Sequence, residues 1–174
     1  MNIWLKEIEL DDGIEYFKLL NELASYTDVY AKPIPEPMPF EDFDDYKKAK
    51  IKIKLGEYKN VSPVSTYWVM NENEPIGYAT LKHDADYEKV GGHFGCCLKK
   101  DYQNKGIGSV VSSKLSQIAY EDLGLEEVIY TSKKENIQSQ MSLKNIGAEY
   151  ILEKDGYYFY KVNLGRMFNK GENR

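Results

Sequence analysis

The spacing of apolar positions changes along this 174-residue chain. A short apolar opening predicts a first strand, with Ile3, Leu5 and Ile8 as its apolar residues. Apolar residues then recur every three or four positions, as in an amphipathic helix. Asp12 and Glu15 resemble a capping box that opens this helix. Its expected apolar face consists of Ile14, Phe17, Leu20 and either Leu23 or Ala24.

A proline-rich connector separates this helix from a second one. Residues 32–39, KPIPEPMP, exclude regular helix and central strand, because proline lacks the backbone N–H and fixes φ. The second helix is expected over about residues 41–55, ended by Gly56. From Val64 onward apolar and polar residues alternate, which predicts a hairpin whose turn spans residues 71–75.

The second half of the chain alternates between strands and helices. A strand is expected over about residues 89–98, followed by a polar turn and a helix to about Leu123. The apolar stripe of that helix is Val111, Leu115, Ile118 and Ala119. EEVIYTS predicts a strand, ENIQSQMSLKNIG a helix, and AEYILEKDG and YYFYKVNL two closing strands. The order βαα-βββ-α-β-α-ββ predicts a mixed α/β fold.

Length and composition fit one globular domain over residues 1–170, with residues 171–174 as a disordered tail. The chain opens without the basic and apolar regions of a signal peptide, and no apolar run approaches the ~20 residues that span a bilayer. We therefore expect a cytoplasmic protein with no membrane partner. The net charge is −5, and the lysines and arginines are scattered among acidic residues, so a nucleic-acid partner is not expected either.

The two cysteines, Cys96 and Cys97, are adjacent. Their spacing does not suit a normal disulfide, and CxxC or Cys/His zinc spacing is absent from the sequence. We expect two buried, reduced strand thiols and no metal cofactor.

Phosphate-binding chemistry is indicated after the strand that ends at Leu98. There the pattern Gln103-x-x-Gly106-x-Gly108 leads directly into a helix. Glycines let a ligand approach the backbone, and the unpaired N–H groups of a first helical turn attract phosphate. Gln103 and Lys105 can add donors. A tight turn with no ligand explains the glycines equally simply.

Other phosphate loops fit this segment less well. A Rossmann fingerprint needs a third glycine where this chain has Val111. A Walker loop needs Gly-Lys-Ser/Thr, which the sequence lacks.

The same segment resembles motif A of the GNAT superfamily of acetyl-CoA-dependent N-acetyltransferases, Arg/Gln-x-x-Gly-x-Gly/Ala after the fourth strand. The stretch GGHFG before it is similar to a little-described bacterial branch of predicted acetyltransferases. The resemblance implies acetyl-CoA as cosubstrate. It also implies a pyrophosphate cradle made of Gln103, Asn104, Lys105, Gly106, Ile107, Gly108 and Ser109.

A second motif strengthens the resemblance. Asn136 and Ser139, followed by Gly147, are similar to the family's Asn-x-x-Ser helix. The strand order matches over about residues 64–164, whereas residues 1–60 match only as strand, helix, helix. The implied fold is a single-domain GNAT-like α/β fold: a mixed central sheet of six to seven strands, about four helices, and splayed fourth and fifth strands.

The resemblance also assigns roles around the thioester. Backbone groups of Cys96, Cys97 and Leu98 would pair with the pantetheine arm, and the N–H near Cys96 would hold the developing oxyanion. Asn136 and Ser139 would face the CoA arm, although Asn136 also suits a helix N-cap.

The usual acid and base are missing from the pattern. Many relatives carry a Tyr where this chain has Leu143, so Ser142 or water would have to protonate the leaving thiolate. Relatives often carry a Glu base near the position of Gly92. His93 is the candidate base here, because histidine titrates near neutrality; a structural role for it stays open.

Acidic and aromatic residues on the expected acceptor side suggest a cationic amine acceptor. They are Glu36, Glu41, Asp42, Asp44 and Asp45, with Tyr26, Tyr30, Tyr157 and Tyr158. A solvated acidic helix start, favoured by the helix dipole, explains the carboxylates equally well. The oligomeric state stays open, and a homodimer is compatible with the sequence.

Three functions fit these observations. The leading one is an N-acetyltransferase that moves acetyl to a primary amine, of a small molecule or peptide, by direct attack in a ternary complex. The alternatives are a non-catalytic acyl-CoA-binding or regulatory module on the same fold, and a nucleotide-binding protein that uses the same loop.

Overall fold

The structure is a computed structural model that describes residues 1–27, 32–84 and 91–168. Tyr30 and the tail over residues 171–174, both singled out in the sequence, lie outside these ranges. The described chain divides into two compact units. The N-terminal unit holds residues 1–81 and 95–114, and the C-terminal unit holds residues 82–94 and 115–174. The single domain over residues 1–170 stays a prediction.

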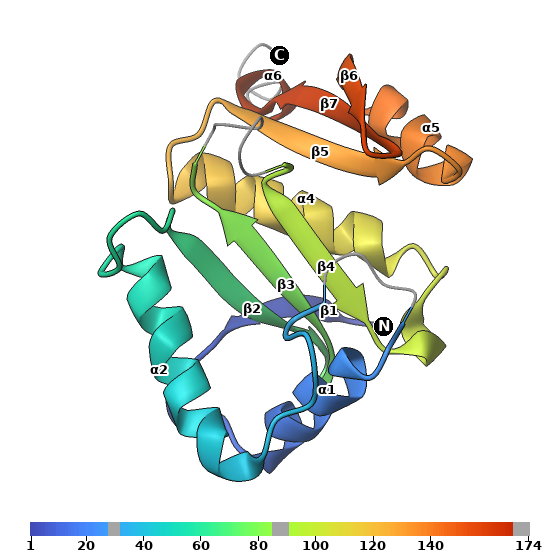
Figure 1. Ribbon diagram of the computed structural model, residues 1–174. Helices are drawn as coiled ribbons and strands as arrows, with labels where there is room; N and C mark the ends of the chain where they lie inside the picture. The colour runs from blue at the N-terminus through green and yellow to red at the C-terminus, as the bar shows by residue number, and fades with distance from the viewer. Residues whose placement is uncertain (28–31, 85–90, 169–174) are drawn as a thin grey trace. The chain divides into compact units, whose positions relative to one another are not determined.

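The N-terminal unit is built on a four-stranded sheet of order β1-β2-β3-β4 (Figure 1). Its strands are β1 (Ile3–Glu7), β2 (Val64–Asn71), β3 (Glu74–Lys82) and β4 (Phe94–Leu98). Its helices are α1 (Ile14–Ala24), α2 (Phe43–Lys54), the 3₁₀ turns η1 (Phe40–Asp42) and η2 (Lys100–Tyr102), and the first half of α4 (Ile107–Glu121). β1 pairs antiparallel with β2, and β4 is the edge strand at the other side of this sheet.

Trp68 of β2 lies at the centre of the core that joins this sheet to α1 and α2. It is fully buried, with the ring of Tyr16 at 5.1 Å and that of Tyr78 at 6.0 Å between centroids. The buried face of α1 is Tyr16, Leu19, Leu20, Leu23 and Ala24. The predicted face was therefore partly wrong: Ile14 is 47% exposed, because the packing of Tyr16 on Trp68 turns the helix.

The predicted capping box at Asp12 is also wrong. Gly13 is the N-cap of α1, and no side chain caps that end. The buried carboxylate of Asp12 instead accepts hydrogen bonds from Trp68 Nε1 at 2.6 Å, the Glu9 N–H at 2.8 Å and Lys6 Nζ at 2.5 Å. A buried indole N–H needs an acceptor, and Asp12 supplies it.

The C-terminal unit contains a three-stranded antiparallel sheet of order β5-β7-β6. Its elements are β5 (Glu127–Lys133), α5 (Ile137–Asn145), β6 (Glu149–Lys154), β7 (Tyr157–Asn163) and α6 (Leu164–Phe168), besides the second half of α4. The sequence predicted that the last strand continues through Leu164. The strand ends one residue earlier, where Asn163 Oδ1 accepts the Arg166 N–H at 2.8 Å and α6 begins.

The element order expected from the sequence is confirmed over the described residues, with α6 added. β4 begins at Phe94, later than predicted, and residues 89–90 lie outside the described ranges. The predicted single mixed sheet is two sheets, and the fourth and fifth strands belong to different ones. In the part of the chain that the structure describes, no helix has both the length and the apolar composition needed to cross a membrane.

Candidate functional site

The loop between β4 and α4 ends in an open glycine turn. Gly106 has φ 77°, and its carbonyl accepts the N–H groups of Ser109 at 3.1 Å and Val110 at 3.3 Å, which starts α4. A Cβ built on Gly106 or Gly108 would meet no atom within 4 Å. Gly108 has no positive φ, so neither backbone conformation nor packing requires glycine there. The backbone of this first turn is open to a ligand.

Two tyrosines connect the loop to the rest of the N-terminal unit by hydrogen bonds. The buried Tyr26 accepts the Lys100 N–H at 3.2 Å and donates to Glu22 Oε1 at 2.7 Å. Burial, followed by the bond to Glu22, raises the Tyr26 pKa to about 12. Tyr102 donates to Glu74 Oε2 at 2.8 Å. The sequence assigned Tyr26 to the acceptor wall, whereas its hydroxyl positions the start of this loop.

The predicted loop donors differ in what they contact. Gln103 Nε2 donates to the Leu98 carbonyl at 2.8 Å, so this amide braces the loop against the end of β4. Asn104 has φ 57° and is exposed, as is Lys105, whose Nζ lies 5.9 Å from the Tyr102 ring centroid. Lys105 is therefore the exposed cation beside the glycine turn.

β4 lies very close to β3 because of a glycine that the sequence reasoning missed. A Cβ on Gly77 would come within 2.7 Å of the Cys97 carbonyl oxygen and 2.6 Å of Leu98 Cδ2. Glycine inside an alternating strand is the signal that could have indicated this close approach. As an edge strand of its sheet, β4 offers backbone N–H and C=O groups for pairing.

Both cysteines of β4 are free thiols. Burial raises the pKa of Cys96 to about 12 and that of Cys97 to about 11. At neutral pH neither is a thiolate, so neither suits a nucleophilic role.

His93 lies just before β4 in the C-terminal unit and is 1% exposed. Its Nδ1 accepts the Ile129 N–H at 2.9 Å, so in the neutral ring the proton is on Nε2, which is buried and has no hydrogen-bond partner among the described residues. Burial, and then the charge of Lys82, lower the His93 pKa. Taking a further proton would break the bond to Ile129. This geometry favours a structural role over the predicted role as base.

The position where relatives carry a Glu base is closed by packing. A Cβ on Gly92 would lie 3.1 Å from Thr131 Cγ2 and 3.2 Å from the Ile129 carbonyl oxygen. The chain there is packed against β5, and this packing leaves no room for a carboxylate side chain in place of Gly92.

The second motif lies on α5 of the C-terminal unit. Asn136 caps this helix, since its Oδ1 accepts the Ser139 N–H at 3.0 Å. Leu143 is 5% exposed and Ser142 is exposed. The interpretation of Asn136 as a helix N-cap is confirmed. The buried Leu143 lies at the position where many relatives carry the tyrosine that acts as general acid.

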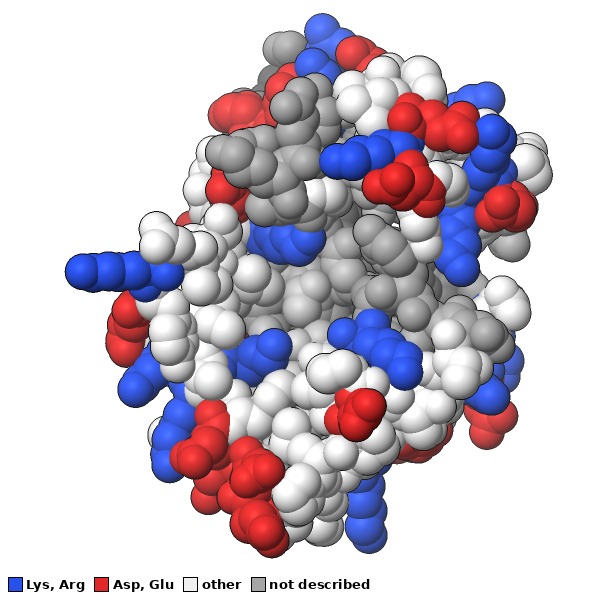
Figure 2. Space-filling view, viewed as in Figure 1, with Lys and Arg blue, Asp and Glu red and all other residues white. Residues whose placement is uncertain are grey.

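Carboxylates gather over the start of α2, as Figure 2 shows. All five predicted acceptor-side acids are exposed: Glu36, Glu41, Asp42, Asp44 and Asp45. Asp44 pairs with the buried Lys47 at 2.9 Å, which lowers the Asp44 pKa, and Asp45 pairs with Lys48 at 3.1 Å. Because two of the five acids pair with lysines of the same helix, the structure favours a solvated helix start over an acceptor site.

Comparison with known proteins gives consistent results. The family model "Acetyltransferase (GNAT) domain" matches residues 2–149. The uncharacterized N-acetyltransferase YnaD of Bacillus subtilis (strain 168) is 27% identical over 81 residues, and the match covers 45% of this chain and 45% of that protein. The chain thus spans less than half the length of this relative.

Solved structures share the fold. The Campylobacter jejuni N-acetyltransferase PseH in complex with acetyl coenzyme A is 15% identical with a TM-score of 0.58, covering 93% of this chain and 99% of PseH. A chimera of the spermidine N-acetyltransferase SpeG from Vibrio cholerae and hSSAT is 14% identical with a TM-score of 0.66, covering 98% of this chain and all of the chimera.

The fold expected from the resemblance is thus confirmed, and the glycine turn of motif A falls inside the matched region. Because the family model covers most of its length, the chain belongs to the GNAT acetyltransferase family, a family of acetyl-CoA-dependent acyltransferases.

Proposed function

We propose that this protein transfers an acetyl group from acetyl-CoA to a primary amine by direct attack within a ternary complex. The observation that carries the proposal is the glycine turn at Gly106 and Gly108, which opens α4 directly after the edge strand β4 and leaves its backbone accessible. A first helical turn with open N–H groups and the positive end of the dipole suits a pyrophosphate.

In this proposal the cofactor contacts fall on two elements of the N-terminal unit. Residues 103–109 cradle the pyrophosphate, with Lys105 as the charged side chain. The backbone of residues 96–98 pairs with the pantetheine arm along the edge of β4. The Cys96 N–H then donates to the thioester oxygen as it becomes negative.

The chemical step needs no covalent enzyme intermediate. The amine nitrogen attacks the thioester carbon, the C–S bond breaks, and CoA leaves as a thiolate. An amine of pKa ~10.4 is only ~0.04% neutral at pH 7, which costs roughly 4–5 kcal/mol before attack. With His93 hydrogen-bonded through Nδ1 and leucine at position 143, we propose that water accepts the amine proton and protonates the thiolate.

An acceptor screen tests this function. Purified protein, acetyl-CoA and a panel of polyamines, amino acids, amino sugars and short peptides are assayed for CoA release and for acetylated product by mass spectrometry. Steady, acceptor-dependent CoA release supports the proposal. Tight acetyl-CoA binding with no turnover on any amine would favour a non-catalytic acyl-CoA-binding module, the alternative that the buried Leu143 supports.

A further inference from the structure

Two phenols lie at the α1–α2 face of the N-terminal sheet, and two lysines lie beside residues of this face. Tyr78 of β3 and Cys97 of β4 belong to the buried cluster on this face. The hydroxyl of Tyr46, from α2, lies 3.3 Å from that of Tyr78. We call these three residues, together with Lys32 and Lys50, the lysine–tyrosine patch. It adjoins the strand that carries the proposed oxyanion donor.

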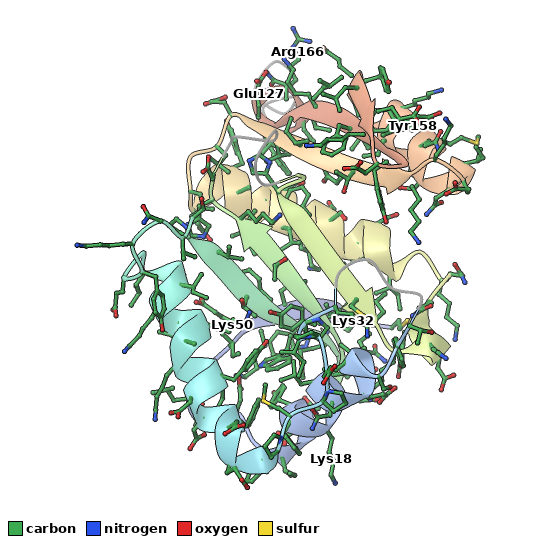
Figure 3. The ribbon with its side chains drawn as sticks, viewed as in Figure 1. Lys18, Lys32, Lys50, Glu127, Tyr158 and Arg166 are labelled. Atoms are coloured by element: carbon green, nitrogen blue, oxygen red, sulfur yellow. The ribbon has the colours of Figure 1, made fainter. Side chains whose placement is uncertain are left out.

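The two lysines approach this patch from different segments, as labelled in Figure 3, where Lys50 lies on the α2 side and Lys32 toward β4. Lys32 Nζ donates to the Ala24 carbonyl at 2.9 Å, and its charge acts on the Cys97 thiol to lower a pKa that burial raises. Lys50 Nζ lies 5.1 Å from the Tyr46 ring centroid. Both side chains are partly buried. The patch therefore carries positive charge next to β4.

Within the described ranges, neither ammonium forms an ion pair with a carboxylate. Glu22 of α1 accepts the Tyr26 hydroxyl instead. At the start of α2, by contrast, Asp44 and Asp45 have lysine partners. Among the described residues, Lys32 and Lys50 thus have no carboxylate partner, whereas two of the acids on the predicted acceptor side are paired with lysines.

The two phenols add neutral donors to this charge. Burial, followed by the proximity of Tyr78, raises the Tyr46 pKa well above its ordinary value, so the phenol keeps its proton at neutral pH. The Tyr46 hydroxyl donates to that of Tyr78, so the O–H of the buried Tyr78 remains to donate to a bound group. Ammonium and phenol donors together bind an anion, and hydrogen bonds from charged donors are the stronger kind.

We propose that the acceptor amine also carries an anionic group, a carboxylate or a phosphate, which Lys32 and Lys50 bind beside Tyr46. This inference rests on the proposed acetyl transfer. The same positive charge disfavours a protonated amine near β4, because like charges favour the neutral form. Polyamines, which bring only positive charge, are poor acceptors for this patch. An amino acid or an amino-sugar phosphate fits it.

Matched acceptors test the anion directly. One arm compares amino acids with their decarboxylated amines, such as phenylalanine with 2-phenylethylamine. The other compares glucosamine 6-phosphate with glucosamine, which separates phosphate from carboxylate. Because a charge-assisted hydrogen bond contributes more than a neutral one, we expect about tenfold or higher kcat/KM for the anionic member of at least one pair. Spermidine should be acetylated at least as poorly as the members that lack the anionic group.

Variants assign that preference to the patch. Lys32→Met and Lys50→Met should each reduce the anionic preference several-fold by raising KM for the anionic acceptor, with little change for the matched amine that lacks the anion. Lys48→Met is the control, since Lys48 is exposed and pairs with Asp45. Turnover without an anionic preference, or a preference unchanged in both patch variants, overturns the inference and leaves acetyl transfer intact. Acetyl-CoA binding without turnover on any acceptor overturns both proposals.

Discussion

Gly108 separates a ligand-binding role of the glycine turn from a packing role. It lies in the first turn of α4, without a positive φ, and a Cβ there would meet no atom of the protein within 4 Å. Glycine is about 0.8–1 kcal/mol less favourable than alanine inside a helix. Gly108→Ala should therefore raise the melting temperature of the ligand-free protein, by up to about 4 °C for a chain of this length.

The substitutions are expected to act in the opposite direction on the rise in melting temperature that acetyl-CoA causes. At a concentration of 100 Kd, acetyl-CoA stabilises the folded state by about 2.7 kcal/mol, which corresponds to a rise in melting temperature of about 5–11 °C. The branched side chain of Gly108→Val would stand where the proposed pyrophosphate site needs an open backbone. This variant should fold as well as the parent and lose most of the ligand-induced rise, with Gly108→Ala intermediate.

Thermal melts with and without acetyl-CoA, supported by calorimetric titration, measure both quantities on each variant. Ser113→Val is the matched control, because it adds a branched side chain at an exposed position of α4 beyond the first turn. It should keep the full ligand-induced rise. If Gly108→Val keeps this rise, the phosphate site is not at the start of α4. If the ligand-free variant is unstable, packing requires the glycine.

Three further predictions follow from the buried groups. Replacing His93 with Gln should keep kcat per folded molecule within a few-fold; a 10²–10⁴-fold loss would restore the base role. Because the His93 pKa is lowered in the fold, the unfolded chain binds a proton first, so stability should fall as pH drops below about 6.5, and pH-dependent melts should show less of this fall in the Gln variant. Cys96→Ala and Cys97→Ser should retain acetyl transfer in steady-state assays, whereas an acetylated cysteine found by mass spectrometry would contradict direct attack. Asp12→Ala should cost about 2–3 kcal/mol in urea unfolding, because it leaves the Trp68 N–H buried without an acceptor, and a loss below 1 kcal/mol would refute that account.

The sequence predicted the element order and the glycine turn because both depend on local chemistry. Periodicity predicted the buried stripe of α4, and Val111, Leu115 and Ala119 are fully buried as expected. Gly106 adopts the positive φ that a strand-to-helix turn uses. The family could be inferred for the same reason. Its motif is a short run of residues, and that run sets the conformation and accessibility of its own backbone.

Only the tertiary structure decided how individual polar groups are used. Asp12 has the sequence context of a helix cap, yet the indole of Trp68, 56 positions further along, takes its carboxylate into the core. His93 has the sequence context of a base, whereas the structure shows its Nδ1 accepting the Ile129 N–H. A side chain's hydrogen-bond partner and its burial come from distant segments, and sequence periodicity carries no information on those pairings. Local pattern therefore determined the order of the elements and the glycine turn, whereas long-range packing decided the hydrogen-bond partners and the burial of individual polar groups.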